Sequence, residues 1–156
     1  LDAGEVGKAV AELRRLTALH PKEALHHADV ARALLAGGMG AAARREAQRA
    51  IEVEPKSAKG HAALAFILTH DLIGRELRKG FDLEGAIAAY RKAKELAPQD
   101  IPIRAELAVL LQHNAEGIRY RKDARLNEAI DEWDRDLMIG PSYFMKKAAQ
   151  TLFRAL

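Results

Sequence analysis

Two stretches of the chain decide its fold: LAFILTHDLIGRELRKGFDLEGAI (64–87) and LAVLLQHNAEGIRYRKDARLNEAI (107–130). They align without a gap at an offset of 43 residues. The residues shared by both copies include Leu64 and Leu107, Ala65 and Ala108, His70 and His113, Gly74 and Gly117, Arg78 and Arg121, Lys79 and Lys122, Leu83 and Leu126, Ala86 and Ala129, and Ile87 and Ile130. Such self-similarity at a fixed period indicates a chain built from stacked repeats.

Prolines mark the ends of the repeats. Pro21, Pro55, Pro98 and Pro141 are spaced 34, 43 and 43 residues apart, and each follows an apolar, helix-like stretch. Proline cannot continue a helix and is common just past its end. The spacing therefore predicts one unit of 34 residues followed by two units of 43.

The segment 24–57 carries small residues at regular places, with Gly38 in the expected turn between two helices. The small residues are Ala31, Ala43 and Ala50, and they are followed by Pro55. In length and in these positions the segment resembles the tetratricopeptide repeat. The resemblance implies an all-α, right-handed superhelical solenoid of antiparallel helix pairs, helix A and helix B, which approach closely at the alanines.

The resemblance organises the whole chain, 1–156, as a single domain. It comprises a partial repeat with a lone B helix (1–21), a repeat of 34 (24–57), two repeats of 43 (58–100 and 101–143) and a terminal helix (142–156). About eight helices are expected, at 3–19, 24–36, 40–53, 58–73, 82–97, 101–116, 125–138 and 142–155. Gly74 and Gly117 are expected as left-handed C-caps of lengthened A helices. Since the chain begins with Leu1, we expect it to be a fragment or a processed form.

Composition excludes several classes of protein. With no cysteine, the chain has no disulfide and no thiolate metal site. No apolar run reaches the roughly 20 residues that a membrane helix needs, so membrane insertion is not expected. The net charge of +3 slightly favours acidic partners and does not indicate a nucleic-acid binder. The compartment stays open, since absence of cysteine fits both the bacterial cytoplasm and the periplasm.

No catalytic motif is present, so we expect no enzyme activity and no cofactor. Ser57 and Ser142 stand beside the inter-repeat prolines, where they are expected to cap helices. The adjacent His26 and His27 point in different directions on a helix, and His70 and His113 belong to different repeats. We therefore expect no metal site. The readings weighed for His70 and His113 are a structural hydrogen bond near the end of the A helix, a groove contact and a metal site.

Tetratricopeptide arrays bind protein segments on the concave surface of their A helices. The resemblance therefore implies a groove lined by Leu25, Arg32, Leu35, Lys59, Phe66, His70, Val109, Gln112 and His113. Members of the family that hold a terminal carboxylate use a clamp of lysine, asparagine and arginine. The matching positions here include Ala28, Arg32, Ala62, Phe66 and Val109, so that mechanism is not expected.

The extra residues of the two longer units are basic. They form a possible ridge of Arg75, Arg78, Lys79, Arg119, Arg121 and Lys122. Such a ridge could contact an acidic partner or phosphates. Alternatively it is a solvated edge whose charges pair locally with Glu76, Glu116 and Asp123.

The function expected is that of a scaffold that binds a protein or peptide in the groove. The alternative is an accessory or oligomerisation domain of a larger bacterial multidomain enzyme, since the HD-x-x-G pattern (70–74) and the segment 80–93 also resemble repeat segments of such proteins. An enzyme or nucleic-acid binder in its own right is disfavoured. Apolar residues of the terminal helix, Phe144, Met145, Leu152 and Phe153, point to a possible homodimer.

Overall fold

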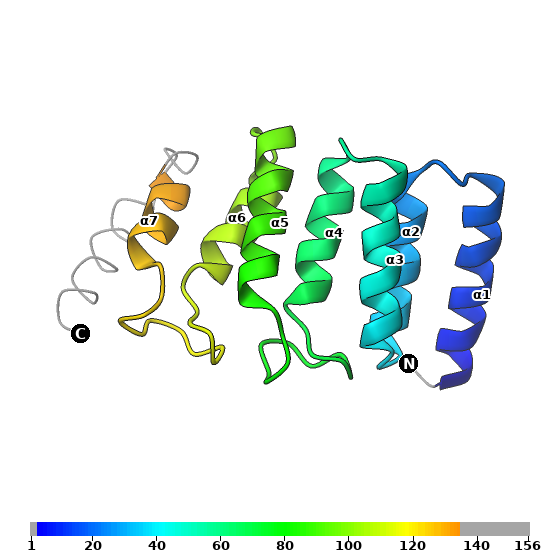
Figure 1. Ribbon diagram of the computed structural model, residues 1–156, viewed down its shortest axis with the longest axis horizontal. Coiled ribbons are helices and arrows are strands. Elements are labelled where there is room, and N and C mark those ends of the chain that lie inside the picture. Colours follow the sequence, from blue (N-terminus) through cyan, green and yellow to red (C-terminus); the bar gives the residue numbers. More distant parts are fainter. Residues whose placement is uncertain (1–2, 135–156) are drawn as a thin grey trace.

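The computed structural model describes residues 3–134, and within this range it contains seven α-helices and no strand (Figure 1). They are α1 (Ala3–Leu19), α2 (Ala24–Ala36), α3 (Gly40–Val53), α4 (Ala58–Leu68), α5 (Leu83–Leu96), α6 (Ile101–Leu110) and α7 (Leu126–Asp134). The predicted terminal helix and the dimer contact assigned to it lie outside the described residues. None of the described helices is long and apolar enough to cross a membrane.

The helix pairs are stacked in a row, and each helix runs antiparallel to the next (Figure 1). Helices α2 and α6 lie behind α3 and α5, and α2 also contacts α4. Helices α2 and α3 form the first complete pair, α4 and α5 the second, and α6 and α7 the third. Helix α1 packs on α2. Charged pairs join the B helices of neighbouring units, since Arg91 and Lys94 of α5 pair with Glu128 and Glu132 of α7.

Alanines occupy the crossings between helices. Those of the repeat pattern are almost completely buried: Ala31, Ala43, Ala50, Ala65, Ala86, Ala93, Ala108 and Ala129. Larger side chains, among them Val30, Ile67, Ile87 and Leu107, fill the space between units. The small residues let paired helices approach closely. The larger ones form two core clusters, one from α1 to α4 and one from α4 to α7, and Leu64 packs against both.

The A helices of the longer units end earlier than predicted. Helix α4 ends at Leu68 rather than at residue 73, and α6 ends at Leu110 rather than at residue 116. Gly74 and Gly117 do have positive φ angles, of 84° and 74°, but they lie in the following loops and do not cap the helices. The residues at the cap positions are Thr69 and Leu111, both in right-handed helical conformation.

The early ends have a local cause. The polar side chains of Asp71 and Asn114 accept hydrogen bonds from backbone N–H groups just downstream, which stabilises a loop turn in place of another helical turn.

The predicted N-cap is confirmed at Ser57, whose Oγ accepts a hydrogen bond from the N–H of Gly60 at 3.3 Å.

The crossing alanines generate a stability prediction. Replacing Ala43 or Ala86 with leucine should destabilise the fold by roughly 1–3 kcal/mol, because both sites are fully buried between paired helices and overpacking forces the helices apart. The matched controls are Ala41→Leu and Ala88→Leu, which lie on the exposed faces of the same two helices. Denaturant midpoints measure the effect, and equal midpoints for the buried and exposed variants would show that the repeat register is wrong.

Candidate functional site

The loops between the helices of the longer units adopt the same backbone structure twice. We call residues 69–82 and 111–125 the insert loops. An isolated antiparallel bridge joins His70 to Glu76 in the first and His113 to Arg119 in the second. The N–H of Leu77 donates to the carbonyl of Thr69 and that of Tyr120 to the carbonyl of Gln112, each at 2.8 Å. Carbonyl groups at the ends of the A helices, which have no partner within the helix, thereby accept hydrogen bonds from the loop.

A side-chain oxygen organises each turn. Asp71 Oδ1 accepts from the N–H groups of Ile73 and Arg75, at 3.0 and 2.9 Å. Asn114 Oδ1 accepts from Glu116 and Ile118 in the same way, at 3.2 and 2.9 Å. The hydrogen bond from the N–H of Arg75 is the largest cause that lowers the pKa of Asp71, and the guanidinium of Arg75 lowers it further. Because the same hydrogen bonds occur in both loops, aspartate and asparagine have the same structural role here.

The two equivalent histidines are buried and face the helix backbone. Nδ1 of His70 lies 2.9 Å from the carbonyl oxygen of Phe66, and Nδ1 of His113 lies 3.0 Å from that of Val109. Burial lowers the pKa of His113 and thus favours its neutral form. Of the readings weighed for these histidines, the geometry supports a structural hydrogen bond at the end of the A helix.

The groove prediction divides into exposed and buried positions. Leu35, His70, Gln112 and His113 are buried, because the insert loops and the neighbouring helices cover the C-terminal ends of the A helices, so these four offer little surface to a partner. The remaining positions are accessible and lie on one side of each helix, seven residues, or about two turns, apart. These positions are Leu25 and Arg32 on α2, Lys59 and Phe66 on α4, and Val109 on α6.

We call these accessible positions the A-helix face. Leu25 and Lys59 occupy equivalent places in successive units, and so do Arg32, Phe66 and Val109. Phe66 is 37% exposed, and its ring centroid lies 4.8 Å from that of His70. The buried histidine therefore supports the exposed aromatic ring from one side.

All six residues of the basic ridge are exposed. Arg75 pairs with Asp71 at 2.7 Å, and Arg119 donates to Gln112 Oε1 at 2.8 Å while it lies over the ring of Tyr120. The other four, Arg78, Lys79, Arg121 and Lys122, make no hydrogen bond or ion pair with a described side chain. Within the described range, none of these four pairs with Glu76, Glu116 or Asp123, the local partners that the alternative reading names.

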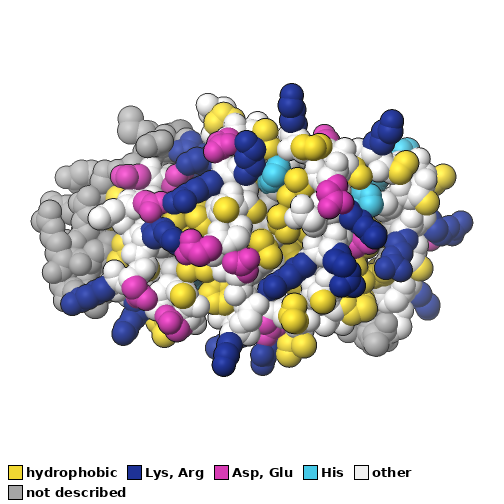
Figure 2. All heavy atoms as spheres, in the orientation of Figure 1, with side chains coloured by type: hydrophobic (Ala, Val, Ile, Leu, Met, Phe, Trp, Pro, Cys, Tyr) yellow, Lys and Arg dark blue, Asp and Glu magenta, His cyan; other side chains and the backbone are white. Residues whose placement is uncertain are grey.

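The sequence did not indicate the apolar residues at the same edge. Leu72, Ile73 and Ile118, in the insert loops, are 51%, 61% and 51% exposed. Together with the basic ridge they lie along the edge at the bottom of Figure 1, where Figure 2 shows hydrophobic side chains beside lysines and arginines. Leu72 and Ile73 fall within the lengthened A helix that the sequence predicts (58–73), which concealed their exposure, and Ile118 lies just beyond the predicted helix 101–116.

The insert loops pack tightly on the preceding units. A Cβ atom added to Gly74 would lie 2.6 Å from the carbonyl oxygen of Leu35, and one added to Gly117 would lie 2.4 Å from that of Leu77. The first loop is also bound by hydrogen bonds, since the N–H of Gly40 donates to Leu72 and Arg44 Nη2 donates to the carbonyls of His70 and Gly80. The ridge is therefore held on an ordered support.

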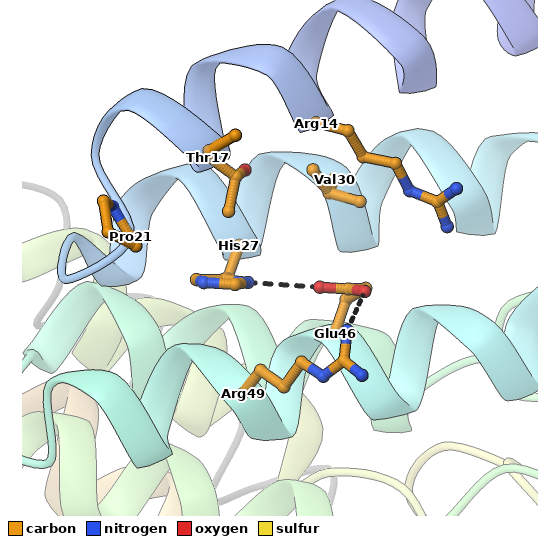
Figure 3. A pocket seen from close by; sticks show the side chains of 8 residues that line it. Arg14, Thr17, Pro21, His27, Val30, Glu46 and Arg49 are labelled. Carbon is orange, nitrogen blue, oxygen red and sulfur yellow. Dashed lines mark hydrogen bonds and ion pairs between the residues drawn. The ribbon is translucent and has the colours of Figure 1, made fainter.

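A shallow pocket lies between α1, α2 and α3, with Thr17, Pro21 and Val30 among the residues that line it (Figure 3). Glu46 projects into it between two partners: His27 Nδ1 lies 3.1 Å from one carboxylate oxygen and Arg49 Nη1 2.8 Å from the other. The carboxylate is already paired, so the pocket presents no free charge from Glu46 to a ligand.

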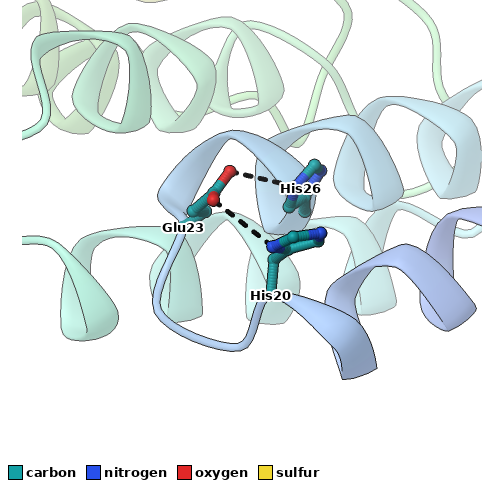
Figure 4. A group of neighbouring side chains, drawn as sticks. All are labelled: His20, Glu23 and His26. Atoms are coloured by element: carbon teal, nitrogen blue, oxygen red, sulfur yellow. Dashed lines mark ion pairs between the residues drawn. The ribbon is translucent and has the colours of Figure 1, made fainter.

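One group of described side chains could hold a metal ion. It consists of His20, Glu23 and His26, which meet at the turn between α1 and α2 (Figure 4). The sequence reading considered His26 with His27 and His70 with His113, and so did not find this group. In the sequence, the spacing H-x-x-E-x-x-H over 20–26 indicates this group.

No protein-family model matches the chain, and neither does any curated protein. Among solved structures, a mutant O-GlcNAc transferase from Thermobaculum terrenum is similar, with a TM-score of 0.61 and 22% identity over 85% of this chain. Two crystal structures of MamA are similar over 97% of this chain, each with a TM-score of 0.64 and 13% identity. The chain covers 23% of the transferase and 86% and 77% of the two MamA chains.

These similar proteins are tetratricopeptide solenoids. Since their identities to this chain are low, the likeness concerns the fold. It confirms the predicted fold class, an all-helical solenoid of the tetratricopeptide type.

The close loop contacts generate a second prediction. Gly74→Ala and Gly117→Ala should each destabilise the fold by about 1–3 kcal/mol, because each substitution places a Cβ against a carbonyl oxygen at a residue with positive φ. Gly7→Ala is the control, since a Cβ there meets nothing within 4 Å and the residue lies inside α1. Urea titration distinguishes them: Gly7→Ala should leave the midpoint unchanged or raise it, and unchanged midpoints for the other two would rule out the loop packing described here.

Proposed function

We propose that the chain is a protein-interaction scaffold and that the A-helix face holds an extended or helical segment of a protein or peptide partner. The chain performs no chemistry in this role. Its contribution is a rigid row of helices that presents equivalent positions at regular intervals.

The observation that carries the proposal is Phe66. It is a large aromatic side chain, 37% exposed, in the central unit of the described row. Its helix is held by its own insert loop, and the ring lies against His70, so little conformational freedom is lost when a partner covers it. Aromatic anchors near the centre of an interface commonly contribute most of its binding energy.

The surroundings of Phe66 suggest the chemistry of the partner. Leu25 and Ile101, on the A helices to either side, are 42% and 56% exposed and add apolar surface. Arg32 on α2 and Lys59 on α4 are exposed cations, and Arg32 forms a long, exposed pair with Asp29 at 3.5 Å. A segment with apolar side chains and some acidic ones fits this combination.

A second candidate function is that of an accessory or oligomerisation domain within a larger enzyme. One observation favours it: the similar transferase is a longer protein, of which this chain covers only 23%. In that case the A-helix face would be covered by another part of the same polypeptide, and the isolated chain would select no separate ligand at Phe66.

Peptide selection tests the proposal. Peptides selected from a random display library on the purified chain should bind Phe66→Ala at least about tenfold more weakly than the native chain, as expected when a buried aromatic anchor is lost. Fluorescence polarisation with a labelled selected peptide measures the affinity. The control is Leu19→Ala, which removes an apolar side chain that is 72% exposed at the end of α1.

The result that contradicts the A-helix face is equally specific. Unchanged affinity for Phe66→Ala, together with lost binding for Arg78→Glu or Arg121→Glu, would move the site to the basic ridge. Failure to select any peptide would favour the accessory domain.

A further inference from the structure

Three metal-ligating side chains meet at the turn between α1 and α2 (Figure 4). His26 Nε2 lies 3.1 Å from one oxygen of the Glu23 carboxylate, and His20 Nδ1 lies 3.5 Å from the other. The two imidazole rings are 5.4 Å apart between centroids and tilted by 40°. One donor atom from each of the three residues lies within 4.8 Å of the other two.

The local backbone places these residues. The N–H of His20 donates to Leu16 at the end of α1, and the N–H of Glu23 donates to the carbonyl of His20 at 3.2 Å, which closes the turn around Pro21. Proline restricts the backbone there further. The turn is therefore set before any ion binds, and only side-chain rotations remain.

The carboxylate of Glu23 is not used to cap the helix. Glu23 is the N-cap residue of α2, but its side chain makes no capping hydrogen bond and is directed at the two histidines instead. Glu23 and His26 are also three residues apart, a spacing that brings a glutamate and a histidine together as ligands in helical metal proteins.

We propose that His20, Glu23 and His26 form a binding site for Zn²⁺. Two imidazole nitrogens and one carboxylate oxygen are a ligand set that zinc accepts, at about 2.0–2.2 Å from the metal. Tetrahedral ligands at such distances lie roughly 3.3 Å apart, so the present separations close with small rotations. His20 and Glu23 are 54% and 58% exposed in their side chains, which permits those rotations.

The site has a structural consequence. It joins the end of α1 to the start of α2, so a bound ion connects the partial repeat to the first complete unit. A ligand that binds only the folded state raises its stability, and zinc should therefore raise the thermal midpoint. Because three protein ligands leave a coordination position open, a water molecule completes the shell.

Titration calorimetry with zinc chloride at neutral pH, on the chain without a polyhistidine tag, tests the proposal. The native chain should bind one zinc ion per molecule and show a higher thermal midpoint with zinc. His20→Ala and His26→Ala should each weaken binding by more than about tenfold and abolish the thermal shift. Both variants should keep the native midpoint in the absence of zinc, which separates loss of the site from loss of the fold.

The matched control is His61→Ala. His61 is on α4, and its Nε2 lies 3.0 Å from the carbonyl oxygen of Pro55, away from the cluster. This variant should bind zinc like the native chain. Absence of saturable binding to the native chain, or equal binding by His20→Ala and His26→Ala, would overturn the proposal and leave the three residues as a surface ion-pair group only.

Discussion

The insert loops touch the preceding units so closely that no Cβ atom fits between the two backbones. At Gly74 and Gly117 that atom would lie 2.6 and 2.4 Å from a carbonyl oxygen. This contact fixes each loop on its neighbour, and the loop in turn closes the end of its own A helix. The burial of His70 and His113, the support beneath Phe66 and the outward presentation of the basic ridge all follow from it. The longer repeats thus keep the helix packing of the solenoid and add a loop that packs on the preceding unit.

Much of the fold could be predicted because it depends on periodic small residues. Ala31, Ala43, Ala65 and Ala86 appear in the sequence at the places where helices must cross, and the structure buries them completely. The ends of α4 and α6 could not be predicted from periodicity, because the apolar pattern continues through Leu72 and Ile73. Each helix ends because the side chain of Asp71 or Asn114 accepts hydrogen bonds from nearby backbone N–H groups. The periodicity of apolar residues does not report this local effect.

The candidate sites were predictable to a lesser degree. The A-helix face follows directly from the repeat register, since Arg32, Phe66 and Val109 are equivalent positions. The other predicted groove positions are buried, because the repeat register does not report that a loop covers the end of a helix. His20, Glu23 and His26 were missed because they meet across a turn, and only the folded turn brings His20 back toward α2. Scaffold surface and zinc site are independent proposals that rest on different residues.

Hydrogen exchange of individual backbone amides, followed by nuclear magnetic resonance, tests the central claim that the insert loops are folded parts of the solenoid. The amides of Leu77 and Tyr120 donate to Thr69 and Gln112 and should exchange as slowly as amides inside α4 and α5. Those of Arg78 and Arg121, which make no backbone hydrogen bond within the described residues, should exchange fast. Exchange of Leu77 and Tyr120 at the same fast rate as Arg78 and Arg121 would contradict the account.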